Sequence, residues 1–197
     1  FNTNKIYIDA FEQIESNIGE TAPEATEELK RSIERGQLIV NYTGHGSPTR
    51  LASETILNIT GISELENQNR LPLFVTATCE FGRHENPKLI SGAEYLLTNE
   101  NGGAIGLVTT SRPVYSSTNF ILNRAFYEHV FSKANGRYQT LGEVFRKTKN
   151  GSLNGTINRN FSLLADPSMT LAYAKKDIRI TNNPEAAIPG DTLKALD

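Results

Sequence analysis

The sequence predicts an α/β fold with a mainly parallel β-sheet and helices on both faces. Four short apolar runs, rich in branched and aromatic residues, are bounded by Gly, Pro or polar residues, as strands are. Helix-like stretches lie between these runs. Such alternation of strand and helix is typical of parallel strands joined by right-handed helical crossovers.

The four predicted strands span residues 5–10, 37–42, 73–78 and 104–109. Three of these runs are almost continuously apolar, which is the pattern of strands that are covered on both faces. This favours a parallel sheet enclosed between two layers of helices.

The sequence marks some helices more clearly than others. The helix predicted over 23–35 has Thr21 as its candidate cap and Gly36 as its stop. The segment 119–131 is amphipathic, with its apolar residues near one face. The other helices are predicted over 53–57, 62–66, 89–98 and 141–149.

Composition narrows the class of protein. The chain has 197 residues, of which 38% are hydrophobic, so it is long enough to bury a sizeable core. The formal net charge of -2 argues against a nucleic-acid partner and against an acidic lipid surface. No apolar run approaches the roughly 18 residues that a membrane span needs.

The composition changes after Tyr173. Residues 174–197 are polar and rich in turn-forming residues, with one short apolar piece at 178–180. We therefore expect residues 1–173 to belong to one domain, and 174–197 to be a linker and the start of a following β-rich domain. A strand-like run begins almost at the first residue, with no signal peptide before it, so we expect a fragment of a longer chain.

Two clusters of chemically capable residues fall at the ends of the second and third predicted strands. The first is Asn-Tyr-Thr-Gly-His-Gly-Ser at 41–47, and the second is Thr-Ala-Thr-Cys-Glu-Phe-Gly at 76–82. Ligands bind beyond the carboxyl ends of strands in an open parallel sheet. If the two strands are neighbours, His45 and Cys79 emerge side by side at one edge of the sheet.

This pair has the chemistry of a thiol peptidase. A thiolate is the nucleophile, and a nearby His promotes its ionisation and later protonates the leaving amine. The Gly residues that flank His45 let the backbone turn sharply and approach a ligand closely. We predict Cys79 as the nucleophile, His45 as the general base and acid, and the backbone N–H groups of Gly46 and Cys79 as oxyanion donors.

Each member of the pair also has a simpler interpretation. Cys79 is the only cysteine, and a free Cys taken alone is more often a small buried hydrophobe than a reactive thiol. His84 is a rival base, although polar loop histidines are mostly solvated, and His129 in a predicted helix is interpreted as structural. The placement of His45 and Cys79 at two strand ends favours the catalytic interpretation.

Three more residues are candidates for substrate binding. Glu80 directly follows the nucleophile, and Arg112 and Tyr115 follow the fourth strand at the same sheet edge. A solvated loop explains the position of Arg112 and Tyr115 equally well. Asp166, before Pro167, is interpreted as a turn or cap rather than as a catalytic acid. No His, Asp or Glu residues have convincing metal-ligand spacing, so we predict no cofactor, with calcium left open.

In this order, the two clusters resemble the gingipain-like cysteine peptidases of family C25. These belong to a wider caspase–legumain group in which a catalytic His-Gly precedes the catalytic Cys, as His45-Gly46 precedes Cys79 here. The resemblance rests on 41–47, 71–82, 102–115 and 163–171, and covers roughly residues 5–173. The group commonly has Ala directly before the Cys, where this chain has Thr78.

The resemblance implies a caspase-like α/β fold, with residues 1–173 as the C-terminal part of a peptidase domain whose upstream part lies outside this sequence. It implies a cysteine endopeptidase or transpeptidase that forms a thioester with a polypeptide substrate. The likeness extends to sortase-like members of the type IX secretion system of Bacteroidetes. For such a member it implies removal of C-terminal sorting domains from secreted cargo and transfer to an amine of lipopolysaccharide.

The same likeness implies contact with other secretion-system components and a secreted or outer-membrane, cell-surface location in a Gram-negative bacterium. Two alternatives stay open. In the first alternative, the chain is part of a plain gingipain-like protease. In the second, it is a non-catalytic α/β module that binds surface partners.

Overall fold

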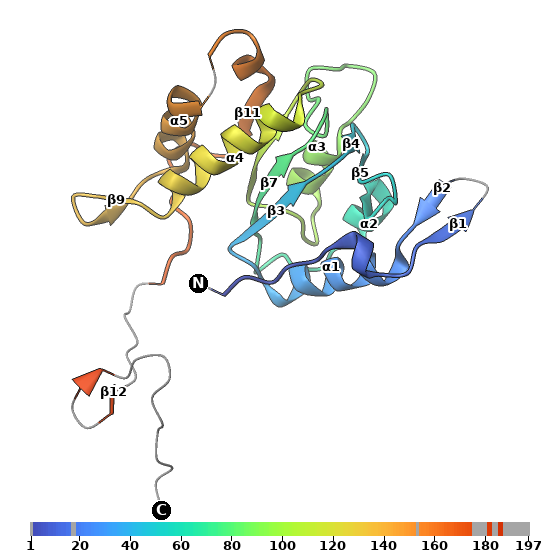
Figure 1. Ribbon diagram of the computed structural model, residues 1–197, viewed down its shortest axis with the longest axis horizontal. Coiled ribbons are helices and arrows are strands. Elements are labelled where there is room, and N and C mark those ends of the chain that lie inside the picture. Colours follow the sequence, from blue (N-terminus) through green and yellow to red (C-terminus); the bar gives the residue numbers. More distant parts are fainter. Residues whose placement is uncertain (1, 17–18, 153, 175–180, 183–184, 187–197) are drawn as a thin grey trace, which may run out of the picture.

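The computed structural model describes residues 2–16, 19–152, 154–174, 181–182 and 185–186, and a four-stranded sheet lies at its centre (Figure 1). The strands are β3 (Ile39–Thr43), β7 (Leu73–Ala77), β8 (Gly106–Thr110) and β11 (Phe161–Leu164), in the spatial order β11-β8-β7-β3. The first three are parallel to one another, and β11 runs antiparallel to β8. The prediction of a mainly parallel sheet is confirmed.

Helices cover both faces of this sheet (Figure 1). One face carries α1 (Pro23–Arg35), α2 (Ile59–Ser63) and α3 (Gly92–Thr98), and the other carries α4 (Ser116–Val130) and α5 (Leu141–Ser152). Successive side chains of a strand point to opposite faces. Accordingly Phe74 belongs to one buried cluster, whereas Leu73 and Val75 belong to the other.

The chain also has short elements outside the central sheet. A three-stranded antiparallel sheet of β4 (Gly46–Ser47), β5 (Arg50–Leu51) and β6 (Leu57–Asn58) follows β3 directly and carries part of the candidate site. The other short elements are two 3-10 helices and three hairpins: η1 (Ile8–Ala10), η2 (Ile157–Asn160), β1 (Ile14–Ser16) with β2 (Gly19–Thr21), β9 (Lys133–Ala134) with β10 (Arg137–Tyr138), and β12 (Thr181–Asn182) with β13 (Glu185–Ala186).

Helix ends follow local chemistry in most cases. Ser91 and Glu94 form a capping box at the start of α3, in which each side chain binds the other residue's backbone N–H. Gly36 ends α1 with a φ of 94°, a conformation that favours glycine, as predicted. The cap predicted at Thr21 is wrong, because Ala22 occupies that position, and the Thr21 hydroxyl instead donates to the carbonyl of Ile14.

Two of the predicted elements are wrong, and one strand of the central sheet and the short hairpin strands were not predicted. Residues 5–10 pair with no strand in the described part of the chain, and η1 occupies 8–10. Residues 53–57 are not helical: Ala52 and Thr55 have φ of 64° and 55°, and Leu57 enters β6. The unpredicted strand of the central sheet is β11, and the strand-like piece predicted at 178–180 lies outside the described residues.

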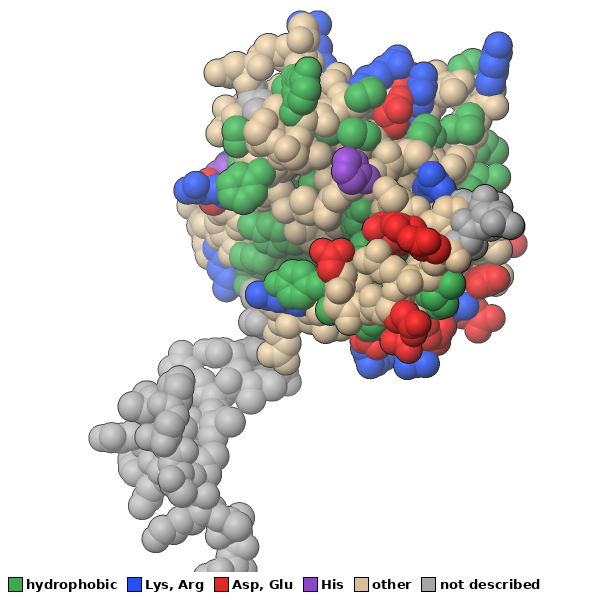
Figure 2. Space-filling view, turned by 45° about the vertical axis from the view of Figure 1, so that its right-hand side comes forward, with side chains coloured by type: hydrophobic (Ala, Val, Ile, Leu, Met, Phe, Trp, Pro, Cys, Tyr) green, Lys and Arg blue, Asp and Glu red, His purple; other side chains and the backbone are tan. Residues whose placement is uncertain are grey.

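The strand β3 is the edge of the central sheet. It pairs with β7 along one side, and no described residue pairs with its other side. Within the described ranges, no helix combines the length and the apolar character needed to cross a membrane. Acidic side chains gather on the lower part of the face in Figure 2, and basic ones are scattered over it, without a continuous basic patch on that face.

Candidate active site

The carboxyl ends of β3 and β7 lie side by side. Thr43 opposite Ala77 is the last pair of this parallel ladder. His45 and Cys79 each follow two residues beyond that pair, on adjacent strands of one sheet edge. The structure therefore brings together the two loops that carry the predicted base and nucleophile.

A close contact joins these two loops between Gly46, which follows His45, and Thr78, which precedes Cys79. A Cβ atom placed on Gly46 would lie 3.0 Å from Cγ2 and 3.2 Å from Cβ of Thr78, and closer still to its Oγ1. Only a glycine fits there without displacement of a neighbour. The glycine after His45 is thus required by packing against the residue before Cys79.

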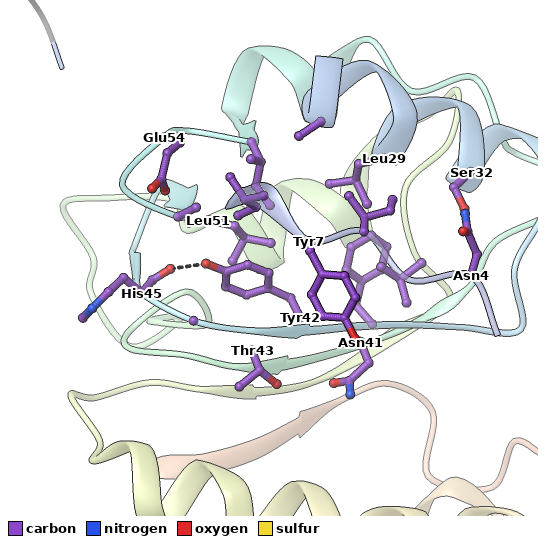
Figure 3. Close-up of a pocket in the computed structure, with 18 of the residues that line it drawn as sticks. Asn4, Tyr7, Leu29, Ser32, Asn41, Tyr42, Thr43, His45, Leu51 and Glu54 are labelled. Carbon is purple, nitrogen blue, oxygen red and sulfur yellow. Dashed lines mark hydrogen bonds between the residues drawn. The ribbon is translucent and has the colours of Figure 1, made fainter. Parts of the chain in front are cut away.

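The turn at His45 is fixed through its carbonyl group. This oxygen accepts from the N–H of Ala52 at 2.9 Å and from the hydroxyl of Tyr42 at 2.6 Å (Figure 3). Burial raises the pKa of Tyr42 to about 12, so the phenol stays a protonated donor at neutral pH. The imidazole of His45 is exposed and points away from the cavity drawn in Figure 3.

The same hydrogen bond defines where the backbone of Gly46 points. In an antiparallel ladder, bonded and non-bonded pairs alternate. Because His45 and Ala52 are a bonded pair, Gly46 and Leu51 are the next, non-bonded pair. The N–H and C=O of Gly46 therefore point away from β5 and take no part in its ladder.

Cys79 is half-buried, and its thiol donates to the carbonyl of Val114 at 3.5 Å. The preceding residue is anchored as well, since the carbonyl of Thr78 accepts from the hydroxyl of Thr110. A cysteine that only filled a core gap would be expected to be fully enclosed. Part of this side chain instead reaches the surface, where the loops after β3, β7 and β8 meet.

Glu80 has a φ of 55°, in the left-handed region that is rare for residues other than Gly, Asn and Asp. This conformation costs of order 1–3 kcal/mol and turns the chain sharply just after Cys79. The Glu80 carboxylate accepts from Arg83 at 2.8 Å, with both side chains half-buried. This ion pair stabilises the loop that contains both residues.

Arg112 and Tyr115 lie on the loop after β8, at the same sheet edge as Cys79. The guanidinium of Arg112 pairs with Glu85 at 3.1 Å, so it ties the loop after β8 to the loop after β7. The side chain of Tyr115 is 73% exposed, at the start of α4. Of the three predicted substrate-binding residues, Tyr115 is exposed and has no ion-pair partner in the described part of the chain, whereas Glu80 and Arg112 are each held in an ion pair.

The remaining histidines and Asp166 have structural partners. His84 is exposed, with Nδ1 2.8 Å from the carbonyl of Gly82, and His129 is half-buried in α4. Asp166 forms the predicted turn, because its carboxylate accepts from the N–H and the hydroxyl of Ser168. These two bonds hold the pKa of Asp166 below its ordinary value.

A cavity of about 520 Å³ lies beside this site rather than over the thiol (Figure 3). It is bounded by the N-terminal segment, α1, β3 and the turn at 51–56, and Cys79 is not among its lining residues. His45 and Tyr42 form its wall toward the site. In the part of the chain that the structure describes, no three His, Cys, Asp or Glu side chains are grouped as metal ligands would be.

Three contacts that shape the site were not predicted from the sequence. They are the Tyr42 bond to His45, the Thr78 packing against Gly46, and the Cys79 bond to Val114. The sequence shows that Thr78 departs from the Ala that is common before the nucleophile in this group. This difference marks Thr78 as unusual, but the sequence does not show which residues the Thr78 side chain contacts.

Comparisons with known proteins show which fold and family the chain resembles. The solved structures that the chain resembles include a complex of the pro- and mature domains of RgpB from Porphyromonas gingivalis, with 18% identity, a TM-score of 0.66, and coverage of 80% of this chain and 38% of that chain. The Arg-specific cysteine proteinase gingipain R (RgpB) gives 18% identity, a TM-score of 0.65, and coverage of 80% and 37%. A structure described only as a protease gives 16% identity, a TM-score of 0.63, and coverage of 82% and 41%.

The chain thus spans about two-fifths of the length of these structures. At such low identity the likeness shows the fold, which confirms the predicted caspase-like α/β architecture. No curated protein sequence matches the chain. The model of Peptidase family C25 matches residues 1–172, so the chain belongs to this family of cysteine peptidases.

Proposed function

We propose that Cys79 and His45 are the nucleophile and the general base of a cysteine peptidase site. The observation that carries this proposal is the register of β3 and β7, in which both residues follow two positions beyond the last pair of one parallel ladder. Family membership supports it, because peptidases of this family are cysteine enzymes. The N–H groups of Gly46 and Cys79 are the proposed oxyanion donors.

In the proposed reaction, His45 takes the thiol proton and the Cys79 sulfur attacks the carbonyl carbon of a peptide bond. The negative charge that develops on the carbonyl oxygen is stabilised by the two N–H groups, each worth on the order of 3 kcal/mol. Collapse of the tetrahedral intermediate breaks the C–N bond, and the His45 imidazolium gives its proton to the leaving amine. The acyl group remains on sulfur as a thioester until water or another amine attacks it.

The loop that follows β8 is the proposed wall for the substrate. Tyr115 presents an open aromatic side chain there. Glu80 and Arg112 are proposed to act by fixing the two loops in shape, because each is held in an ion pair with a neighbour.

Within the family, we propose a PorU-like sortase. It would remove C-terminal sorting domains from secreted cargo and transfer the acyl group to an amine of lipopolysaccharide. The support is the family match together with the sequence likeness described above. In this proposal residues 1–173 are the C-terminal part of the peptidase domain, and 174–197 lead into a following β-rich domain.

The same proposal places the protein at the outer-membrane surface or outside a Gram-negative cell, among other secretion-system components. A plain gingipain-like protease is the second candidate, and it differs only in that water attacks the thioester. A non-catalytic surface-binding module is the third candidate. The position of the half-buried Cys79 beside His45, at the ends of neighbouring strands, argues against this third candidate.

The test of the catalytic pair uses the full-length protein and its cargo. Cys79→Ala and His45→Ala are each expected to stop cargo processing, whereas the matched control His84→Ala is expected to leave it intact. Processing that persists in Cys79→Ala rules out the proposal. Loss in His84→Ala but not in His45→Ala would reassign the base.

Mass spectrometry of the processed cargo separates transfer from hydrolysis. An amine-linked product supports the sortase, and a free new carboxyl terminus excludes the transfer reaction. We also expect residues 1–197 alone to be inactive on peptide substrates, because the proposed domain needs its upstream part. Turnover by this piece alone would contradict that expectation.

A further inference from the structure

We infer that Thr78 is a positioning residue for this site, and that its hydroxyl donates to the carbonyl oxygen of Gly46 when an acyl group occupies Cys79. This inference rests on the proposed function. It concerns a residue that does not touch substrate, since the Thr78 side chain is fully buried.

Thr78 differs from the other buried threonines around it. The hydroxyls of Thr76 and Thr109 bind each other at 2.7 Å, and that of Thr110 donates to the carbonyl of Thr78. In the described part of the chain, the hydroxyl of Thr78 is buried and has no hydrogen-bond partner. A buried hydroxyl without a partner is unfavourable and needs a physical explanation.

The surroundings of this hydroxyl point to its partner. The Thr78 side chain packs directly against Gly46, where a Cβ would lie 3.0 Å from Cγ2 and nearer to Oγ1. The N–H and C=O of Gly46 point away from β5, because Gly46 and Leu51 are a non-bonded pair. The carbonyl of His45 already accepts two hydrogen bonds, so the polar groups of Gly46 are the ones left for Thr78.

A bond from Thr78 to the Gly46 carbonyl would orient the Gly46 backbone without using its N–H. That N–H then remains for the oxyanion, which develops its charge only during the reaction. In this inference, the hydroxyl that lacks a partner in the described structure gains its bond once the thiol is acylated. Such an interaction raises kcat and leaves KM unchanged.

The experiment compares Thr78→Val and Thr78→Ser in the full-length protein. Val keeps the shape of Thr and removes the hydroxyl, whereas Ser keeps the hydroxyl. We expect Thr78→Val to lower kcat about tenfold with KM unchanged and with no loss of stability, because it removes an unpaired buried polar group. Thr78→Ser is expected to remain within about threefold of the wild-type kcat.

A matched control is Thr148→Val. Thr148 is also fully buried, but its hydroxyl donates to the carbonyl of Val144 within α5, on the opposite helical layer. This variant is expected to lose stability and to keep kcat. A positioning residue is expected to change kcat without a change in stability, and a structural residue to change stability without a change in kcat. The two valine variants are therefore expected to differ in both measurements.

The inference is overturned if Thr78→Val folds and keeps its kcat, or if it loses stability and kcat together. If Thr78→Val does not fold, then Thr78→Ser and Thr78→Ala, which differ by the hydroxyl, are compared instead, and equal kcat values overturn the inference. Cys79→Ala distinguishes the two levels of the argument. Processing that survives Cys79→Ala removes the proposed function, whereas its loss there alongside an unchanged Thr78→Val removes this inference alone.

Discussion

A methyl group added at Gly46 tests the contact that joins the two catalytic loops. Gly46 does not have a left-handed φ, so an alanine is tolerated by the backbone, and the effect of Gly46→Ala comes from packing alone. The new Cβ would lie 3.0 Å from Cγ2 and 3.2 Å from Cβ of Thr78, and nearer to Oγ1. Either the Thr78 side chain or the turn at His45 has to move.

Overpacking of this kind costs about 1–3 kcal/mol of stability. Thr78→Ala removes the two nearest atoms, Oγ1 and Cγ2, and by itself costs about 1 kcal/mol for the methyl group that is lost. In the double variant the methyl at position 46 fills the space that Thr78 vacates. We therefore expect the double variant to be more stable than the sum of the single effects, by about 1–2 kcal/mol.

The assay is native-state hydrogen exchange of the β3 and β7 amides in the full-length protein, which reports the opening free energy of this sheet locally. Cargo processing is measured in parallel, and Gly46→Ala is expected to lower kcat/KM roughly ten- to a hundredfold, because His45 is displaced. The control is Gly61→Ala in α2, where the new Cβ would meet its nearest neighbours at an ordinary 3.6 Å. A neutral Gly46→Ala, or strictly additive single effects, would refute the contact between the loops.

Three further predictions concern single side chains. Tyr42→Phe removes the 2.6 Å bond to the His45 carbonyl, so kcat/KM for cargo processing should fall about two- to tenfold; an unchanged value would show that this bond does not hold the turn. Ser168→Ala should raise the pKa of Asp166 toward its ordinary value, as measured by NMR titration. The stabilising contribution of Asp166, present above its unfolded pKa and lost as pH falls through the lower folded pKa, should become smaller in that variant, because the backbone N–H of residue 168 still donates to the carboxylate. Asn67→Ala leaves buried backbone groups of Gly103 unpaired and should cost about 3 kcal/mol in chemical denaturation, whereas a loss under 1 kcal/mol would contradict this account.

The central strands were predictable because their apolar runs are covered on both faces. The predictions at 37–42, 73–78 and 104–109 match β3, β7 and β8 to within two residues. The run at 5–10 has the same composition but pairs with no described strand, since a ladder needs a partner that local sequence does not reveal. The prediction of a helix at 53–57 is wrong because Ala52 and Thr55 adopt left-handed φ values. Ala and Thr rarely adopt this conformation, so the sequence gives no sign of it.

The candidate site also has features that the sequence predicted and features that it did not. The sequence placed His45 and Cys79 at the ends of two strands, and the parallel register then brought those ends together. Glu80 and Arg112 were expected to face a substrate, and their ion pairs with nearby loop residues depend on loop conformations that no local pattern encodes. The Thr78 contact depends on how the first strand of the three-stranded sheet approaches the loop after β7, which is likewise a long-range property.

The unpaired side of β3 has a practical consequence for work with recombinant pieces of this chain. Along this flank, alternate residues of β3 direct their backbone N–H and C=O groups away from β7, and no described strand pairs with them. Such a flank recruits strands from other molecules. A piece covering residues 1–174 is therefore expected to self-associate as its concentration rises, and a lysine at the exposed Asn41 or Thr43 is the substitution most suited to keep it monomeric for crystallisation or NMR.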